Sequence, residues 1–194
     1  MADANGHHIR RISKVAGFSP TWSPDGSRLA YVWNGVVILR SDGSHVHRLP
    51  IEGGEMQVVW SSRNQLLISH MLEAPLLQVA RPDGSGLRTL RRGQPDEAFV
   101  NPKWSLDGRR IIYEHWTGCV GSKCGGSDGI EIADLRGNVV RSLGDGEYPT
   151  WSPSGTRIAY ATVDGVFIRS LVAGSTRQIF EGSLETAGIG WQAR

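Results

Sequence analysis

Pro20-Thr-Trp-Ser-Pro-Asp-Gly26 is the stretch that decides the fold, because its pattern recurs along the whole chain. A Trp returns every 38 to 47 residues, and a Ser follows it in the first four copies. The fourth residue after each of these four Trp residues is Gly or Asn, as a tight turn that ends in a left-handed residue requires. The five Trp residues are Trp22, Trp60, Trp104, Trp151 and Trp191.

Each turn is followed by an apolar strand, a loop, a second β-rich run, a Gly-containing turn and a shorter strand. With the Trp strand, this makes four strands in a unit of about 40 residues, which is the size of a propeller blade. We expect the units at about 15-50, 51-92, 93-144 and 145-181, within a single domain spanning 1-194. The sequence therefore predicts an all-β protein, a β-propeller with about four complete four-stranded blades.

The turn and the strand after it resemble the WD40-like repeats of TolB-type β-propellers, whose pattern is Pro-x-Trp-Ser-Pro-Asp-Gly, then Arg or Lys, then Ile-Ala-Tyr. Residues 20–31 match it almost throughout, residues 149–160 nearly as well and residues 102–108 well, whereas the unit at Trp60 is degenerate. The resemblance implies a ring of typically six blades. It also implies a bacterial protein that binds other proteins at the cell envelope, in the periplasm.

Two short segments remain outside the four units. Gly6 to Ser13 is predicted to be the outer strand of a preceding blade, and Ile189 to Trp191 the inner strand of a following one. Relative to a six-bladed ring we therefore expect a partial or truncated propeller, with a compact five-sector ring as the alternative. Exposed strand edges pair readily with other chains, so self-association through open propeller edges is expected.

Composition excludes several classes of function. The formal net charge of +2 over 194 residues is too small to indicate nucleic-acid binding. No apolar run of 18 or more residues is present, so membrane insertion is not expected. The first eight residues lack the apolar segment of a signal peptide. Taken alone, this favours the cytoplasm. The alternative is an extracytoplasmic location of a protein whose leader was lost.

Function is expected on the face that carries the divergent loops between second and third strands, because these loops vary in length while the Trp-Ser turns are uniform. The loops leading into the Trp strands share this face and are acidic, which would favour a basic peptide or a cation, although surface loops are commonly polar. Trp33 and Trp116 lie outside the repeat position and are candidate contact residues. The acidic residues are Glu52, Glu55, Asp96, Glu97, Asp145 and Glu147, followed by Glu181 and Glu185.

Cys119 and Cys124 are the only cysteines, and they lie in the longest divergent loop. A local disulfide is the first expectation and would indicate an oxidising compartment; free thiols, or a metal with the nearby His115, are the alternatives. His70 and Glu114 both follow their Trp by ten residues; surface polar residues at strand ends are the first expectation, and a neighbouring pair on the divergent face is the alternative. Acid–base chemistry would need a nucleophile or a metal as well, and the sequence supplies neither.

These observations favour a non-enzymatic β-propeller scaffold that binds a protein or peptide through the divergent loop face. No catalytic, cofactor-binding or metal-binding residue is predicted. The alternative is a propeller module of, or derived from, an enzyme, because TolB-like propellers resemble the gating domains of serine peptidases and the propellers of some polysaccharide lyases.

Overall fold

The computed structural model describes residues 7, 11–13, 15–51, 55–71, 74–120, 124–182 and 189–191. These residues form sixteen strands and no helix. Each set of four consecutive strands makes one antiparallel sheet. The sheets consist of β1 (Phe18–Trp22), β2 (Arg28–Val32), β3 (Val36–Arg40) and β4 (His47–Arg48); β5 (Glu55–Trp60), β6 (Leu66–Met71), β7 (Leu76–Ala80) and β8 (Arg88–Arg92); β9 (Ala98–Trp104), β10 (Arg110–Thr117), β11 (Gly126–Asp134) and β12 (Val139–Ser142); and β13 (Glu147–Trp151), β14 (Arg157–Thr162), β15 (Gly165–Ser170) and β16 (Thr176–Glu181).

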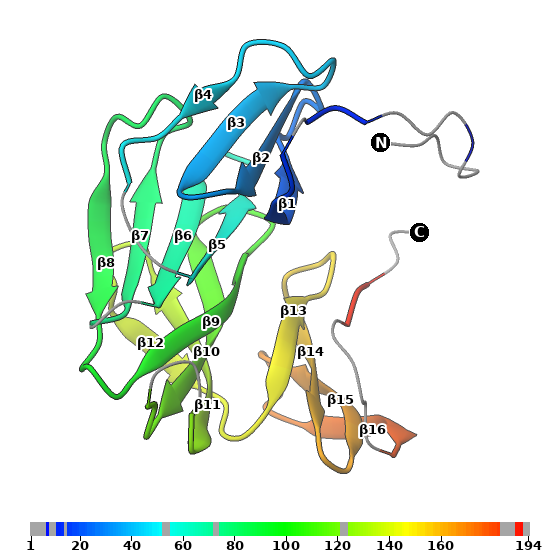
Figure 1. Ribbon diagram of the computed structural model, residues 1–194. Helices are drawn as coiled ribbons and strands as arrows, with labels where there is room; N and C mark the ends of the chain where they lie inside the picture. The colour runs from blue at the N-terminus through cyan, green and yellow to red at the C-terminus, as the bar shows by residue number, and fades with distance from the viewer. Residues whose placement is uncertain are drawn as a thin grey trace.

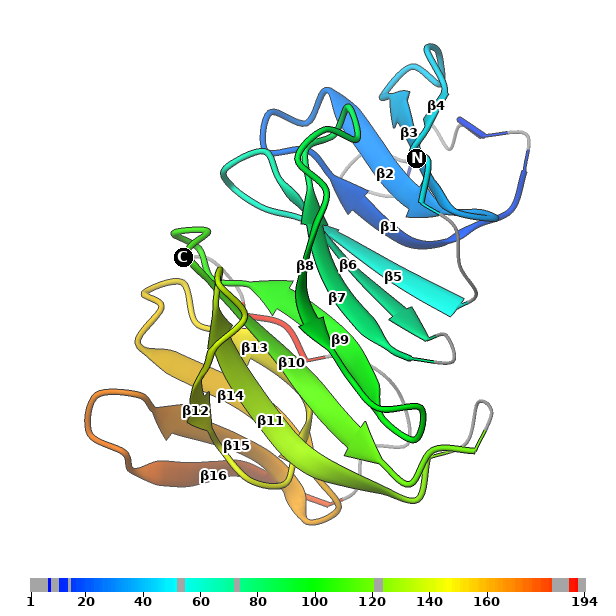
Figure 2. The ribbon, with the colours of Figure 1, turned by 90° about the vertical axis from the view of Figure 1, so that its left-hand side faces the viewer.

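The four sheets follow one another as the blades of a propeller. Each Trp strand is the first strand of its sheet and contacts the first strand of the next sheet, so that β1 meets β5, β5 meets β9 and β9 meets β13. Figure 1 shows the blades as an arc that runs from β1–β4 at the top to β13–β16 at the bottom. In Figure 2 the sheet of β5–β8 lies between those of β1–β4 and β9–β12. The predicted fold class is confirmed.

The Trp-Ser turns are held by one repeated set of hydrogen bonds. In the first unit Ser23 Oγ donates to Asp25 Oδ1 at 2.6 Å and accepts from the amide of Arg28 at 2.9 Å. The hydrogen bonds from Ser23 and Ser27 lower the pKa of Asp25 to about 2. Gly26 closes this turn with φ 67° and Asn64 closes the second with φ 56°, which explains why only Gly and Asn occupy the position.

The core of the described residues has three layers, each between two neighbouring blades, and a smaller cluster of Tyr31, Val37 and Leu39 on the open side of the first blade. Trp60, Trp104 and Trp151 are buried in these layers, where apolar side chains of one sheet pack against those of the next. A guanidinium of the preceding blade stacks on two of the indoles: Arg28 lies 5.0 Å from the ring centroid of Trp60, and Arg110 lies 5.7 Å from that of Trp151.

Trp22 departs from this pattern, because 43% of its surface is exposed. Unlike Trp60, Trp104 and Trp151, Trp22 is therefore not enclosed between two blades. The physical reason is that no described blade packs in front of β1. The large exposed side chain of Phe18 on the same strand has the same cause.

The two segments outside the blades keep side-chain contacts but form no strand among their described residues. Trp191 Nε1 donates to the carbonyl of Thr150 at 3.3 Å, just as Trp104 Nε1 donates to the carbonyl of Val59 at 3.1 Å. Trp191 thus occupies the inner position of a next blade. At the other end, Ile12 packs against the open side of the first blade, while residues 6 and 8–10 of the expected strand lie outside the described residues.

Replacing Trp104 by Phe should lower the free energy of unfolding by about 1–3 kcal/mol, because a smaller ring leaves part of the buried space unfilled and the hydrogen bond to Val59 is lost. The same change at the half-exposed Trp22 should cost less than about 1 kcal/mol. Urea denaturation of both variants measures the difference. Equal losses would contradict the layered packing.

Candidate binding face

The loops that differ between units lie at one end of the propeller, here called the loop face. They join the second strand of each blade to the third. The loops that lead into β5, β9 and β13 lie at the same end, because successive strands of each sheet are antiparallel. The Trp-Ser turns and the turns between third and fourth strands lie at the opposite end, here called the turn face.

The longest loop of the loop face joins β10 to β11 and carries a disulfide between Cys119 and Cys124. The amide of Cys119 donates to the carbonyl of Asp96 at 2.8 Å, so this loop is tied to the loop that leads into β9. Among the described residues no group of three or more His, Cys, Asp or Glu side chains could hold a metal ion. In the described part of the chain, no helix is long and apolar enough to cross a membrane.

Beneath this loop, side chains of the second and third blades form a polar network around His115. The ring nitrogens of His115 lie between two carboxylates: Nε2 is 3.3 Å from Glu97 Oε1, and Nδ1 is 3.5 Å from Glu131 Oε1. Tyr113 donates its hydroxyl to Glu131 Oε2 at 2.5 Å. Arg91 of the second blade lies 3.7 Å from the same oxygen and stacks on the ring of Tyr113.

Burial alone would raise the pKa of Glu131, but the hydrogen bonds from His115 and Tyr113 and the charge of Arg91 lower it below its ordinary value. The pKa of the Tyr113 hydroxyl is raised, first by burial and then by its bond to Glu131. Glu131 is therefore a charged acceptor at neutral pH. The network holds β8, β10 and β11 together under the loop face.

Glu114 is buried on the other side of β10. Its carboxylate accepts hydrogen bonds from Asn101 Nδ2 at 2.6 Å, from the amide of Tyr148 at 2.6 Å and from Trp116 Nε1 at 2.9 Å. Burial outweighs these bonds, so the pKa of Glu114 is raised above its ordinary value. Trp116, which the sequence analysis names as a candidate contact residue, is thus half-buried and holds Glu114 in place.

His70 and Glu114 are neither surface residues nor neighbours, which corrects both interpretations of their spacing: each residue is 1% exposed, and Glu114 accepts a hydrogen bond from the fourth blade. The second turn is one residue shorter than the others, since Trp60 pairs with Leu66 whereas Trp104 pairs with Ile111. One residue of shift reverses the side of the sheet on which a side chain lies. His70 therefore lies on the side of β6 that packs against the first blade, where burial lowers the pKa of its imidazole.

The acidic residues of the loop face differ in accessibility. Asp96 and Asp145 are exposed. Glu97 is half-buried and, besides its contact with His115, accepts a hydrogen bond from the amide of Gln94 at 2.7 Å. Glu147, the first residue of β13, is also half-buried. The backbone of Glu55 begins β5 and Glu181 ends β16 as an exposed residue, whereas Glu52 and Glu185 lie outside the described residues.

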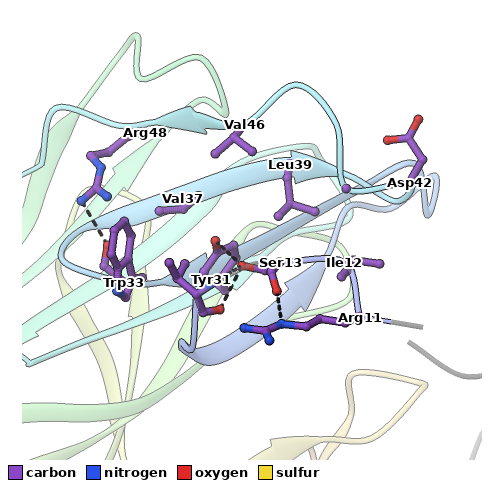
Figure 3. Close-up of a pocket in the computed structure, with 12 residues that line it drawn as sticks. Arg11, Ile12, Ser13, Tyr31, Trp33, Val37, Leu39, Asp42, Val46 and Arg48 are labelled. Carbon is purple, nitrogen blue, oxygen red and sulfur yellow. Dashed lines mark hydrogen bonds between the residues drawn. The ribbon is translucent and has the colours of Figure 1, made fainter. Parts of the chain in front are cut away.

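Trp33 is 40% exposed and lies at the edge of a groove of about 600 Å³ on the open side of the first blade. Figure 3 shows Tyr31, Val37 and Leu39 along this groove, with the segment from Arg11 to Ser13 crossing it. The guanidinium of Arg48 stacks on the Trp33 indole at 4.7 Å and donates to the carbonyls of Trp33 and Asn34.

The network around His115 contains three residues that the sequence reasoning missed: Arg91, Tyr113 and Glu131. A signal for Glu131 was present, because a Glu between Ile130 and Ile132 in a strand must lie on the opposite side from both. No comparable signal marked Arg91, which reaches the network from another blade.

The fold is similar to that of several solved propellers. TolB from Acinetobacter baumannii matches with a TM-score of 0.68 and 19% identity, over 89% of this chain and 46% of that one. Oligogalacturonate lyase from Vibrio parahaemolyticus matches with a TM-score of 0.68 and 12% identity, over 92% and 58%. A nidogen/laminin complex matches with a TM-score of 0.64 and 14% identity, over 89% and 66%.

These similarities assign the TolB-like β-propeller fold to the chain, as the Trp-Ser-Pro-Asp-Gly turns predict. The chain spans about half to two thirds of the length of these structures. No protein-family profile matches it. No curated protein sequence matches it either.

Removing the Tyr113 hydroxyl with Tyr113→Phe should lower the free energy of unfolding by about 1.5–3 kcal/mol at pH 7, because a buried hydrogen bond to a charged carboxylate is lost. Because the pKa of Glu131 is lowered in the folded protein, ionised Glu131 stabilises the fold above its unfolded-state pKa of about 4.3. This stabilisation is lost as the pH falls through the folded-state pKa. The deficit of the variant should therefore shrink below about pH 4. Urea denaturation of the unmodified protein and of the variant, at pH 7 and below about pH 4, measures this deficit.

Tyr160→Phe is the matched control, since Tyr160 occupies the same repeat position in the fourth blade and donates to no carboxylate of a described residue. It should cost less than Tyr113→Phe and show no such pH dependence. A pH-independent deficit in Tyr113→Phe would contradict the assigned bond.

Proposed function

We propose that the chain is a non-enzymatic β-propeller scaffold that binds a basic peptide segment of a partner protein on its loop face. The observation that carries the proposal is the pair of exposed carboxylates, Asp96 and Asp145, on the loops that enter the neighbouring strands β9 and β13. Exposed carboxylates on one face attract a cationic partner and orient it during encounter.

The loop that carries Asp96 is held in place from two sides. The backbone carbonyl of Asp96 accepts a hydrogen bond from the amide of Cys119, which forms the disulfide. The side chain of Glu97 is held by His115 and by the amide of Gln94. A binding loop that is already ordered loses less conformational entropy when its ligand binds. The buried network beneath the loop face therefore supports recognition without contacting the partner.

The similar structures support a protein partner in general terms. One of them is a complex of nidogen with laminin, and two thirds of that propeller chain align with this one. TolB is also similar in fold, and the resemblance of the repeat to TolB-type propellers implies binding to other proteins. Because all of these identities lie below 20%, the specific partner does not transfer to this chain.

The alternative is a propeller module derived from an enzyme, which the similarity to oligogalacturonate lyase favours. Acid–base chemistry would need two titratable groups that converge on one accessible cavity. Here Glu97, Glu131 and His115 are engaged with one another and with Tyr113, and the buried Glu114 accepts a backbone amide. A binding role therefore fits the geometry better.

Reversing the charge of one exposed carboxylate, in Asp96→Lys or Asp145→Lys, should weaken binding of a fluorescein-labelled decalysine peptide about three- to ten-fold at low ionic strength. The loss should diminish as salt is added, because exposed charges are screened. Fluorescence anisotropy measures both effects.

Asp42→Lys is the control, because Asp42 is an exposed carboxylate in the turn between β3 and β4, on the turn face. It makes the same change of net charge and should leave the affinity within about two-fold. If all three variants lose affinity equally, the peptide recognises net charge and the proposed face is wrong.

A further inference from the structure

The turn face, which the sequence assigns to scaffolding, carries a basic groove between the first and second blades. The groove has a volume of about 480 Å³ and is lined by residues of both blades. Three guanidinium groups face a single lining carboxylate, that of Asp83. The lining residues are Arg28, Arg63, Asn64, Gln65, Arg81, Pro82 and Asp83.

The three arginines come from three separate elements and are held in defined positions. Arg28, at the start of β2, stacks on Trp60 and donates to Asn64 Oδ1 at 3.1 Å. Arg63, in the turn between β5 and β6, donates its Nε to the carbonyl of Asp107 at 2.6 Å. Arg81, in the turn between β7 and β8, contacts Ser85 Oγ at 3.3 Å.

These contacts leave much of the donor capacity of the groove unused. The Arg63 bond involves only Nε, so its two terminal nitrogens make no hydrogen bond to a described residue. No carboxylate of the described residues lies within ion-pair distance of the three guanidinium groups. Asn64 Oδ1 accepts from both Arg28 and Trp60 Nε1, which leaves the Asn64 amide nitrogen as a further donor.

Comparison of equivalent positions shows that the charge of this groove is not a property of the repeat. Arg63 replaces the turn aspartate, which is Asp25 in the first unit and Asp107 in the third. Between the second and third blades, the positions that correspond to Arg28, Arg63 and Arg81 hold one glutamine and two aspartates. Between the third and fourth blades, they hold one arginine and two serines. These residues are Gln65, Asp107 and Asp134, and then Arg110, Ser154 and Ser170.

We propose that this groove is a binding site for a compact ligand that carries two or more oxyanion groups, carboxylate or phosphate. Guanidinium groups pair with both by parallel N–H···O bonds, and three of them around one groove match a ligand with several anionic groups. The volume of the groove lies in the range of small-molecule sites. The site lies on the face opposite the proposed peptide-binding loops and is independent of them.

Isothermal titration calorimetry of the full chain at low ionic strength tests the proposal, with citrate as the tricarboxylate probe and pyrophosphate as the phosphate probe. We expect saturable one-to-one binding of at least one probe. The probe that binds more tightly identifies the anionic group that the groove prefers. Absence of saturable binding of either probe up to about 10 mM would overturn the proposal.

Two variants locate the site. Arg63→Asp restores the residue that the repeat carries at this turn, and Arg81→Gln removes one charge without touching an interblade hydrogen bond. Each should weaken binding about ten-fold, as expected for loss of a charge-assisted contact. Circular dichroism checks folding, and Arg81→Gln decides the question if Arg63→Asp does not fold.

Arg109→Gln is the matched control, since Arg109 is an exposed arginine of the third turn on the same face but outside the groove. It should leave the affinity within about two-fold. Equal weakening by Arg81→Gln and Arg109→Gln would show that the probes respond to net charge alone and would overturn the assignment.

Discussion

The packing of each inner strand against the preceding blade is the interaction on which the rest of the structure depends. Trp104 shows it most completely: its ring is buried between two sheets, and its indole N–H reaches the carbonyl of Val59 on the preceding inner strand. Backbone geometry supports the same contact, since Asn101 adopts a left-handed φ of 50° and donates its amide to Gln57 Oε1 of the preceding blade at 2.7 Å. A four-stranded sheet is unstable alone, so each blade is stabilised through its neighbour.

Because of this packing, the turns at one end of the propeller can vary less in sequence and length than the loops at the other end. The Trp-Ser turns must place the second strand correctly, and Ser23 and Asp25 show the hydrogen bonds that do so. The loops at the other end do not set the position of the second strand, and there the chain carries its disulfide and the exposed Asp96 and Asp145. In the second unit, Arg63 stands where the first and third units carry a turn aspartate, and it lines the basic groove together with Arg28 and Arg81.

The sequence predicted the blades well because turns and strands depend on local chemistry. Gly or Asn at the end of each turn and alternating apolar residues after it define the unit without reference to other blades. The site was less predictable, since its contacts join different blades. Arg91 meets Glu131 from another sheet, and one residue fewer in the second turn places His70 on the side of its sheet that faces the first blade. The exposure of Trp22 likewise depends on contacts between blades, because no described blade packs in front of β1.

Hydrogen–deuterium exchange resolved by strand tests most directly the claim that a blade is stabilised by packing its inner strand on the preceding blade. The inner strands β5, β9 and β13 have such a neighbour, whereas β1 has none among the described residues. We predict that amides of β9 are the most protected and that those of β1 exchange markedly faster, although both strands are paired within their own sheets. Equal protection of β1 and β9 would contradict the account.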